Sequence, residues 1–401
     1  MSHLKLWLLP VAAALGPVYW LPGISPGALE SMKVLIFGAA IVSCLSTRPN
    51  LVKISDLTFF GAISALFLLS YIANNEVGSI DVLIALGFYL YFYAFPPAAS
   101  AEEFRILAFR SALIFSAFTL IVIFDFFMGG LFFNPFYKYQ LPLFLSGFHG
   151  GRTGWAFSSN IFLAITLATF FITKTKPAKF LLLSISFAIS LNIILVGSRG
   201  GVVVMSLLLC SFLYLLIKKE RYTHFIVFGL LLATSAFYYI SVNHGTQVSL
   251  RVVDVFLGTG DVKIFEDQSR SDSFEVVMQQ VLDRPIFGSG LVDLVGHGFN
   301  FSRIHNVWLR IAVENGIPSA FLILVFFLLL TYRVSQSKFE GGRVFILMMI
   351  VVLVTSQLEP TTVFGGFFSS FSFWLILASI IKLGTLDFFD KQSVEIKLTN
   401  A

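Results

Sequence analysis

Long apolar stretches fill most of the chain and alternate with short polar segments. A helix that crosses the hydrocarbon core of a bilayer needs about 20 mostly apolar residues, within a range of about 17 to 25. Measured against that length, the pattern predicts an all-α polytopic membrane protein with about twelve transmembrane helices. The predicted spans are Leu4–Trp20, Ala28–Leu45, Leu57–Ile72, Ile80–Phe95, Phe104–Met128, Thr153–Thr173, Phe180–Val196, Gly201–Ile217, Phe225–Val242, His305–Tyr332, Val344–Leu358 and Val363–Leu383.

The composition excludes a soluble enzyme. Hydrophobic residues make up 57% of the 401 positions and charged residues 12%, with a mean hydropathy of +0.87, whereas a soluble domain carries about 25% charged residues. The formal net charge is +5, but the basic residues lie in short loops between apolar spans, so we expect membrane lipids and no nucleic acid as partners. Cys44 and Cys210 lie inside apolar runs, which gives neither a disulfide framework nor metal-ligand spacing. No metal and no cofactor are therefore expected.

Basic residues gather in every second loop, which predicts the orientation of the chain. Cytoplasmic loops carry an excess of Lys and Arg, and an even number of spans then puts both termini in the cytoplasm. The longest hydrophilic segment, 243–304, lies on the opposite side, which is the periplasm if the membrane is a bacterial inner membrane. The other sizeable outer loop, Gly129–Arg152, is expected to lie in the membrane interface. The basic loops contain Arg48 and Lys53, then Lys174, Lys176 and Lys179, then Lys218, Lys219 and Arg221, then Arg333, Lys338 and Arg343.

The first span is expected to be a retained helix and not a cleaved signal peptide. Lys5 precedes an apolar run, as in a signal peptide. Pro10, Pro17 and the bulky pair Tyr19-Trp20 do not suit a small-residue cleavage site.

The segment Gly197-Ser198-Arg199-Gly200-Gly201 joins two predicted spans at the outer face. Its glycines permit a tight turn with N–H groups pointing into a shared space, and the N-terminus of the helix that follows favours an anion. Arg199 adds a planar guanidinium that suits phosphate oxygens. The alternative is an ordinary tight turn with a snorkelling arginine.

A second polar segment runs from Ser269-Arg270 through Asp272 to Pro285-Ile286-Phe287-Gly288-Ser289-Gly290. Asp272 and Glu275 have the spacing of a capping box, and Pro285 stops the helix that follows. A short amphipathic helix is therefore predicted at the outer mouth of the bundle, and a solvated loop charge is the alternative role for Arg270. The predicted apolar face of this short helix contains Phe274, Val277, Met278, Val281 and Leu282.

A third segment, His305-Asn306 to Glu314-Asn315-Gly316-Ile317-Pro318, opens the tenth predicted span. Arg310 and Glu314 have the i,i+4 spacing of a helical ion pair. Asn315-Gly316 followed by Pro318 should break the helix, leaving a short outer half-helix that carries His305. His305 is either an interfacial histidine with a satisfied ring or a base.

Together these three segments supply two arginines and a titratable base beside apolar walls on one side of the membrane. That combination suits a lipid diphosphate whose tail stays in the bilayer. The sequence shows neither a glycosidase-like carboxylate pair nor a cluster with metal-ligand spacing.

In their order and spacing, the three segments resemble the superfamily of O-antigen ligases and O-antigen polymerases, which are bacterial envelope glycosyltransferases. The close resemblance covers about 180–330 of what we predict to be a single transmembrane domain over 1–401. It implies a GT-C-like fold with short helices in the periplasmic loop 243–304. It also implies a glycan donor on a polyprenyl diphosphate, usually undecaprenyl diphosphate, and a metal-independent inverting transfer without a cofactor.

By the same resemblance, Arg199 and Arg270 match diphosphate-binding arginines and His305 matches the proposed base. O-antigen ligation to lipid A-core in lipopolysaccharide biosynthesis is the preferred function, and a lipid-linked repeat unit is the acceptor if the protein is a polymerase. Possible supporting residues are Ser198, Gly200, Asn306, Arg303 and Glu314. Further outer-face candidates are Arg152, Lys138, His149 and Arg310.

Two other classes of protein remain open. Twelve spans also suit a transporter or flippase, but transporters built from inverted repeats should show broken helices in both halves. In this chain the polar residues concentrate at the outer mouth of one half, and Asp125 and Glu314 are among the few acids in or beside spans. A non-catalytic scaffold for envelope assembly is the third possibility.

Overall fold

A computed structural model describes residues 2–47, 49–75, 80–134, 142–148, 152–217, 277–290, 306–336, 342, 345–347, 349, 352–353 and 371–383 of the chain. Its labelled helices are α1 (Ser2–Leu15), α2 (Pro26–Cys44), α3 (Ile54–Asn74), α4 (Ile80–Ala94), α5 (Ala101–Phe127), α6 (Leu143–Ser146), α7 (Arg152–Ile172), α8 (Lys176–Val196), α9 (Arg199–Ile217), α14 (Val307–Asn315) and α15 (Ile317–Gln336). A further apolar helix is Phe371–Leu383.

Six of the described helices are long and apolar enough to cross a membrane, by length and composition: α2, α3, α5, α7, α8 and α15. This result supports the predicted all-α multi-pass membrane protein. The predicted span Phe225–Val242 lies outside the described residues, as do much of Val344–Leu358 and the first part of Val363–Leu383. The number twelve and the GT-C-like fold therefore stay predictions.

Side-chain caps and prolines set several helix boundaries. Ser100 Oγ accepts a hydrogen bond from the N–H of Glu103 at 3.2 Å, and Glu103 Oε2 accepts one from the N–H of Ala99 at 2.9 Å. This reciprocal cap starts α5 at Ala101, three residues before the predicted start. The prediction that the first span continues as a helix to Trp20 is wrong, because α1 ends at Leu15. Pro17 disfavours a helical conformation at the residue before it, which ends the helix.

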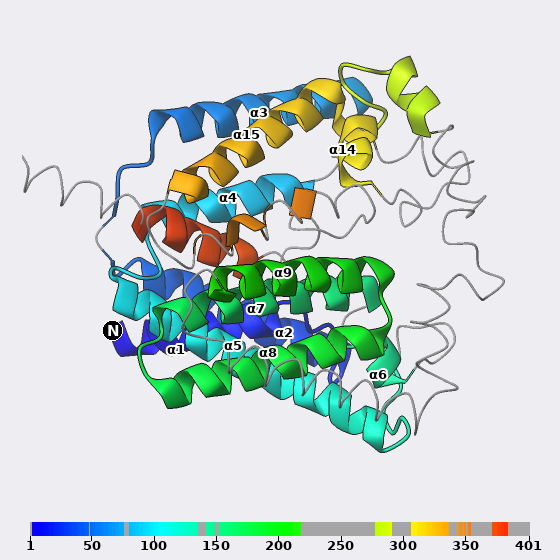
Figure 1. Ribbon diagram of the computed structural model, residues 1–401. Coiled ribbons are helices and arrows are strands. Elements are labelled where there is room, and N and C mark those ends of the chain that lie inside the picture. The colour runs from blue at the N-terminus through cyan, green and yellow to red at the C-terminus, as the bar shows by residue number, and fades with distance from the viewer. Residues whose placement is uncertain are drawn as a thin grey trace, which may run out of the picture.

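The helices form two groups, which are both visible in Figure 1. One group contains α3, α4, α14 and α15, and the other contains α1, α2, α5, α7, α8 and α9. Phe371–Leu383, drawn in red, lies between them. The Phe371 ring lies 4.6 Å from that of Phe37 on α2 and 5.4 Å from that of Phe88 on α4, so this helix joins the two groups.

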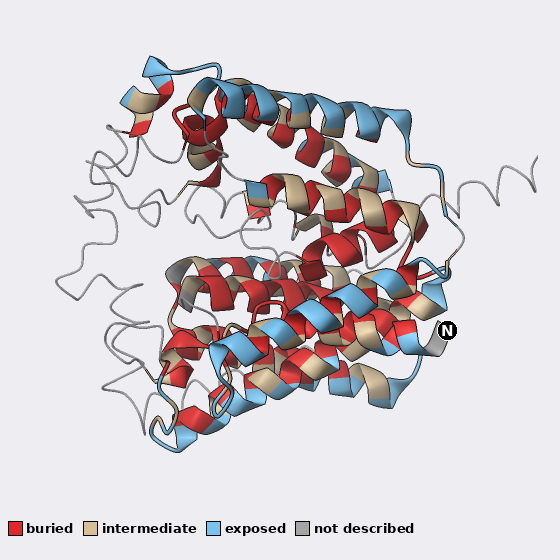
Figure 2. Ribbon diagram, turned by 180° about the vertical axis from the view of Figure 1, so that it is seen from behind, coloured by how far each residue is buried: buried red, intermediate tan, exposed pale blue. Residues whose placement is uncertain are grey.

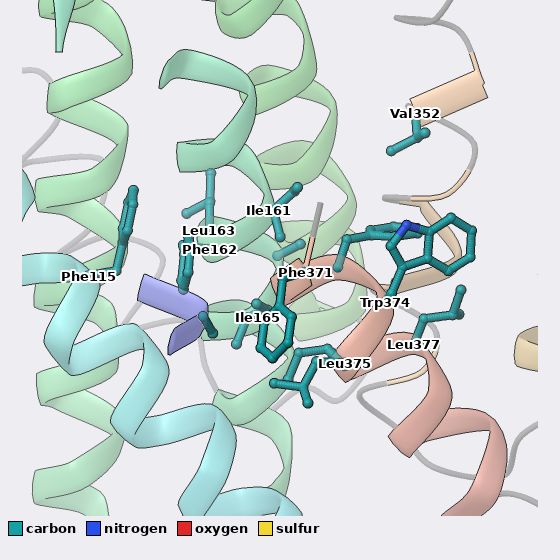
Figure 3. Packing of buried hydrophobic residues seen from close by; sticks show 14 of the residues in the cluster. Phe115, Ile161, Phe162, Leu163, Ile165, Val352, Phe371, Trp374, Leu375 and Leu377 are labelled. Carbon is teal, nitrogen blue, oxygen red and sulfur yellow. The ribbon is translucent and has the colours of Figure 1, made fainter. Parts of the chain in front are cut away.

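Aromatic packing continues on both sides of this junction, as Figure 3 shows for part of the buried cluster. The rings of Phe115 on α5 and Phe162 on α7 stack at 4.0 Å. Trp374 contacts the ring of Tyr89 at 6.3 Å on the opposite side. Exposed positions follow the outward faces of the helices in Figure 2, and many carry large apolar side chains such as Leu35 and Leu68. An apolar outer surface is what lipid-facing helices present.

Contacts between helix termini show which loops share an end of the bundle. Lys5 Nζ lies 3.7 Å from Glu103 Oε2, which places the starts of α1 and α5 together. The last turn of α15 meets the start of α3 through Arg333 and Asp56. The opposite end contains the turn between α8 and α9, together with α6, α14 and residues 277–283 (Figure 1). We call it the Gly197 end, and its assignment to the periplasm stays a prediction.

A buried carboxylate on α5 holds the described parts of the segment after that helix, residues 129–134 and 142–148, against the bundle. Asp125 Oδ1 accepts the N–H of Phe132 at 2.8 Å, and Asp125 Oδ2 accepts the N–H of Phe144 at 3.0 Å. Each oxygen therefore satisfies one backbone donor of these described residues, and the second donor belongs to α6. Asp125 thus has a structural role at the Gly197 end, and it offers no support for a transport path.

Candidate functional site

The turn between α8 and α9 is tight, as its glycines predict. Gly197 has a left-handed backbone with φ +67°, and its N–H donates to Ile194 O at 3.0 Å, which ends α8. Ser198 is buried, and its hydroxyl accepts the N–H of Gly201 at 3.3 Å. This is an N-cap contact for α9, which begins at Arg199. The N-terminus of α9 is therefore placed at the Gly197 end.

The first turn of α9 lies directly against α7, and only a glycine fits there. A Cβ atom on residue 201 would lie 2.7 Å from Ala156 Cβ. Asn160 Nδ2 donates to Gly201 O and to Ala156 O, both at 3.0 Å, so this side chain joins the two helices. At Gly200 a Cβ atom would meet nothing within 4 Å. The two neighbouring glycines therefore differ, since Gly201 permits a close approach of helices and Gly200 leaves space.

A buried polar network fixes α7 against α8 next to this turn. Trp155 Nε1 donates to Asn192 Oδ1 at 3.2 Å, and Asn192 Nδ2 donates to Ser159 Oγ at 3.0 Å. The Trp155 ring also lies directly beneath Gly147, where a Cβ atom would overlap it. Because buried polar groups are costly when unpaired, this network specifies one arrangement of the helices that support the α8–α9 turn.

The predicted helix before Pro285 is present in its described part. Residues 277–283 are helical and end two residues before that proline. Val277 and Val281 are buried against Ala312 and Val313 of α14. The predicted apolar face is wrong in one respect, because Leu282 is 68% exposed. The contact with α14 involves the side chains of Val277 and Val281, and residue 282 is rotated by about 100° from residue 281.

The break in the tenth predicted span is also confirmed. α14 ends at Asn315, Gly316 has φ +86°, and α15 begins at Ile317. Asn306 is the N-cap of α14, because its Oδ1 accepts the N–H of Leu309 at 3.0 Å. The first described residue of this segment therefore fixes the start of the short outer helix that the sequence predicts.

The second and third sequence motifs interlock through their backbones. Ser289 donates its N–H to Val313 O at 2.6 Å, and Gly290 donates to Glu314 O at 3.3 Å. Ile317 donates its N–H to Pro285 O at 2.8 Å. We refer to residues 284–290 and 313–317 together as the interlock. The second and third motifs, which are separate in the sequence, thus form one structural unit.

Glycines make this crossing possible. A Cβ atom on residue 288 would lie 2.5 Å from Val313 O, and one on residue 316 would overlap Ile286 O. Both glycines also have positive φ, +70° and +86°, which other residues rarely adopt. The glycines of these motifs are therefore explained by backbone contact between the motifs.

Arg310 is bound to carboxylates within the structure. Its Nη2 lies 3.1 Å from Asp81 Oδ2 at the start of α4, and its Nε lies 4.0 Å from Glu314 Oε1. The predicted i,i+4 pair therefore exists, but the closer partner is Asp81. Glu314 is buried. This places Arg310 and Glu314 in the frame that supports α14 and makes Arg310 a weaker candidate for binding a diphosphate.

The residues predicted to carry the chemistry lie outside what the structure describes. This holds for Arg270, His305, Arg303, Lys138 and His149, and for the side chains of Arg199 and Arg152. The positions of their neighbours are defined, since α9 begins at Arg199 and α14 begins two residues after His305. Both helix starts lie at the Gly197 end (Figure 1). Convergence of the three side chains stays a prediction.

The sequence reasoning missed several polar residues that hold the site elements in place. These are Ser70 and Asn74 on α3, Asn160 on α7, and the Trp155–Asn192 pair. A signal exists for some of them, because polar side chains inside apolar spans usually bond to neighbouring helices or to a functional path. The partner of each one depends on helix packing, which the local pattern does not contain.

Comparison with protein families identifies residues 181–324 as a match to the family described as O-Antigen ligase. The match runs from α8 through the α8–α9 turn and the interlock into α15. It confirms the resemblance that the three motifs indicate, and it supports a membrane protein of the O-antigen ligase or polymerase type that acts as a glycosyltransferase-like enzyme. A comparison with curated proteins finds no matching relative.

Proposed function

We propose that the protein transfers a glycan from a polyprenyl diphosphate to an acceptor hydroxyl at the periplasmic face of a bacterial inner membrane. The observation that carries this proposal is the family match over 181–324, within which two motifs interlock at the junction of α14 and α15. The first motif, Gly197–Gly201, contains the start of α9 at the same end of the bundle. Lipid-linked glycans are the substrates that this family implies in general.

In the proposed reaction the acceptor oxygen attacks the anomeric carbon of the donor sugar. The bond between that carbon and the diphosphate oxygen breaks, and its electron pair leaves with the polyprenyl diphosphate. Arg199 and Arg270 bind the diphosphate, because positive charge placed where negative charge develops lowers the barrier. His305 takes the proton of the hydroxyl, which makes the oxygen a better nucleophile. Attack from the face opposite the leaving group inverts the anomeric configuration.

Several described features support this assignment of roles. The N-terminus of α9 favours an anion beside Arg199, and Ser198 and Gly201 fix the turn from which that residue projects. Asn306, which caps α14, follows His305 directly. Glu314, in the last turn of α14, contributes through its contact with Arg310 on the same helix.

The preferred acceptor is lipid A-core, which makes the reaction an O-antigen ligation in lipopolysaccharide biosynthesis. A polymerase would use a second lipid-linked repeat unit as the acceptor, with the same donor and the same chemistry. The two reactions give different products from the same membranes. With lipid A-core present, a ligase produces glycan-bearing lipopolysaccharide, whereas a polymerase lengthens the lipid-linked glycan with no core acceptor.

The test measures glycan transfer in membranes that contain equal amounts of each variant. We expect His305→Ala and Arg199→Ala each to lower the transfer rate by about 100-fold or more, the usual contribution of a catalytic base or of charge stabilisation. His3→Ala and Arg105→Ala serve as controls, because both residues lie at the opposite end of the bundle. Full activity in a well-expressed His305→Ala variant removes the base assignment. Placement of residue 305 in the cytoplasm by topology mapping removes the whole proposal.

A further inference from the structure

Two polar residues on α3 point to a support for the site that lies outside the family match. Ser70 and Asn74 stand four residues apart in the last turns of α3, so they share one face of that helix. Ser70 is buried, although most of α3 is apolar and exposed. Polar side chains at such positions bond to neighbouring elements when they are buried.

Both side chains bond to the backbone of the interlock. Ser70 Oγ donates to Phe287 O at 2.7 Å and lies 3.2 Å from Glu314 O, so one hydroxyl contacts both segments of the interlock. Asn74 Nδ2 lies 3.2 Å from Phe287 O and 3.2 Å from Gly288 O. Arg284 Nη1 donates back to Asn74 Oδ1 at 3.3 Å. More than two hundred positions of sequence separate the partners in each of these bonds.

The helix that follows α3 adds a charged contact to the same unit. Asp81, in the first turn of α4, pairs with Arg310 on α14 at 3.1 Å. The hairpin of α3 and α4 therefore holds residues 284–290 by hydrogen bonds and α14 by an ion pair. The family match begins at residue 181, so none of these three supports lies within it.

We propose that Ser70 and Asn74 are positioning residues for the transfer reaction. The α3 pair fixes the crossing of residues 284–290 over residues 313–317 at the end of α14. The nine-residue α14 is one rigid helix, so holding its end also positions its start, two residues after His305. A small displacement of a reacting group is costly, because about 1 Å of misplacement lowers a rate by up to about 100-fold. This inference rests on the proposed function, in which His305 is the base.

Ser70→Val and Ser70→Thr form a matched pair, because valine and threonine have the same shape and only threonine keeps the hydroxyl. Ser116→Ala is the control, since Ser116 Oγ donates to Leu113 O at 2.7 Å within α5 and away from the interlock. Hydrogen exchange at the amides of Ser289, Gly290 and Ile317 measures how often the interlock opens. We expect Ser70→Val to speed this exchange by about fivefold, the effect of losing one buried hydrogen bond. Ser70→Thr and Ser116→Ala should leave it unchanged.

Kinetics separate positioning from donor binding and from stability. In Ser70→Val we expect kcat for glycan transfer to fall by about tenfold. KM for the polyprenyl-diphosphate donor should stay within about twofold, because neither Arg199 nor Arg270 belongs to the interlock that Ser70 holds. Ser70→Thr should restore the wild-type rate. If Ser70→Val fails to accumulate in membranes, Asn74→Asp provides the second variant, because it keeps the shape but removes both N–H donors.

The outcomes are distinguishable. Unchanged exchange and unchanged kcat in a folded Ser70→Val protein overturn the inference, as do equal losses in Ser70→Val and Ser70→Thr, which would show an effect of size alone. A loss confined to KM also overturns it. If the wild-type protein transfers no glycan, the proposed function fails, and the role of the pair in catalysis fails with it. In that case the exchange data still decide whether Ser70 holds the interlock.

Discussion

Gly316 crosses Ile286 so closely that a Cβ atom on residue 316 would overlap the carbonyl oxygen of Ile286. Beside this crossing, Ile317 donates its N–H to Pro285 O at 2.8 Å. The break between α14 and α15 is therefore more than a kink in a membrane helix. At this break, residues 284–290 from earlier in the chain pack against the backbone of residues 313–317.

The first prediction concerns Gly316→Ala. The added methyl group collides with backbone and forces an unfavourable φ of +86° on alanine, so we expect a loss of about 1–3 kcal/mol in the free energy of unfolding. Glycan transfer should fall by at least about tenfold in the protein that remains folded. Thermal unfolding in detergent and transfer assays measure the two effects. Gly38→Ala on α2, where a Cβ atom meets nothing within 4 Å, is the control.

The second prediction compares Gly201→Ala with Gly200→Ala. The first substitution forces α9 away from α7, because its Cβ atom would lie 2.7 Å from Ala156 Cβ, whereas the second meets open space. Since Arg199 precedes both, we expect Gly201→Ala to reduce donor binding and transfer by about tenfold and Gly200→Ala to leave both nearly unchanged. Equal activity of the two variants would contradict the importance of the α7–α9 contact. Donor KM and transfer rate are the measurements.

Much of this architecture follows from local patterns in the sequence. Apolar stretches locate α3, α4 and α7 within a few residues, and Gly197 and Gly316 mark the two breaks because positive φ is nearly restricted to glycine. Errors occur where a local rule competes with packing. Leu282 fits an apolar helical face by spacing, yet the short α14 covers only the row that contains Val277 and Val281.

The supports of the site could not be predicted in the same way. Ser70 is separated from its partner Phe287 by 217 positions, and Arg310 from Asp81 by 229. Nothing near Ser70 in the sequence indicates which loop its hydroxyl meets, because that partner is set by how α3 packs against α14 and α15. Only the chemical type of such residues, polar within an apolar helix, is visible beforehand.

The third prediction uses Arg199→Lys to examine diphosphate binding. Lysine keeps the positive charge but loses the planar fork that bonds two phosphate oxygens at once. We expect KM for the donor to rise by about tenfold, the effect of about 1.4 kcal/mol, with a further fall in kcat. Wild-type kinetics in Arg199→Lys would show that charge alone suffices at this position. Arg105→Lys at the other end of the bundle is the matched control.

The fourth prediction concerns the ion pair between the buried Asp56 and the partly buried Arg333, at the end of the bundle opposite the interlock. Arg333 Nη2 lies 2.6 Å from Asp56 Oδ1 and Nη1 lies 2.6 Å from Asp56 Oδ2, so the contact is bidentate. Tyr89 donates its hydroxyl to Asp56 Oδ2 at 3.1 Å, which ties α4 to the same pair. The helices α3, α4 and α15 are thus joined to one another away from the interlock.

Removing Arg333 leaves the Asp56 carboxylate buried and unpaired, which costs up to about 3–5 kcal/mol in comparable cases, whereas removing Asp56 costs less because Arg333 is partly exposed. Arg333→Met and Asp56→Asn should therefore each lower the unfolding temperature and the amount of protein in membranes. The double variant should lose clearly less than the sum of the two single losses, because it leaves no unpaired charge. Per folded molecule, kcat and KM should remain close to wild type, since the pair lies far from the Gly197 end. Additive losses in the double-mutant cycle would show that the two charges do not depend on each other.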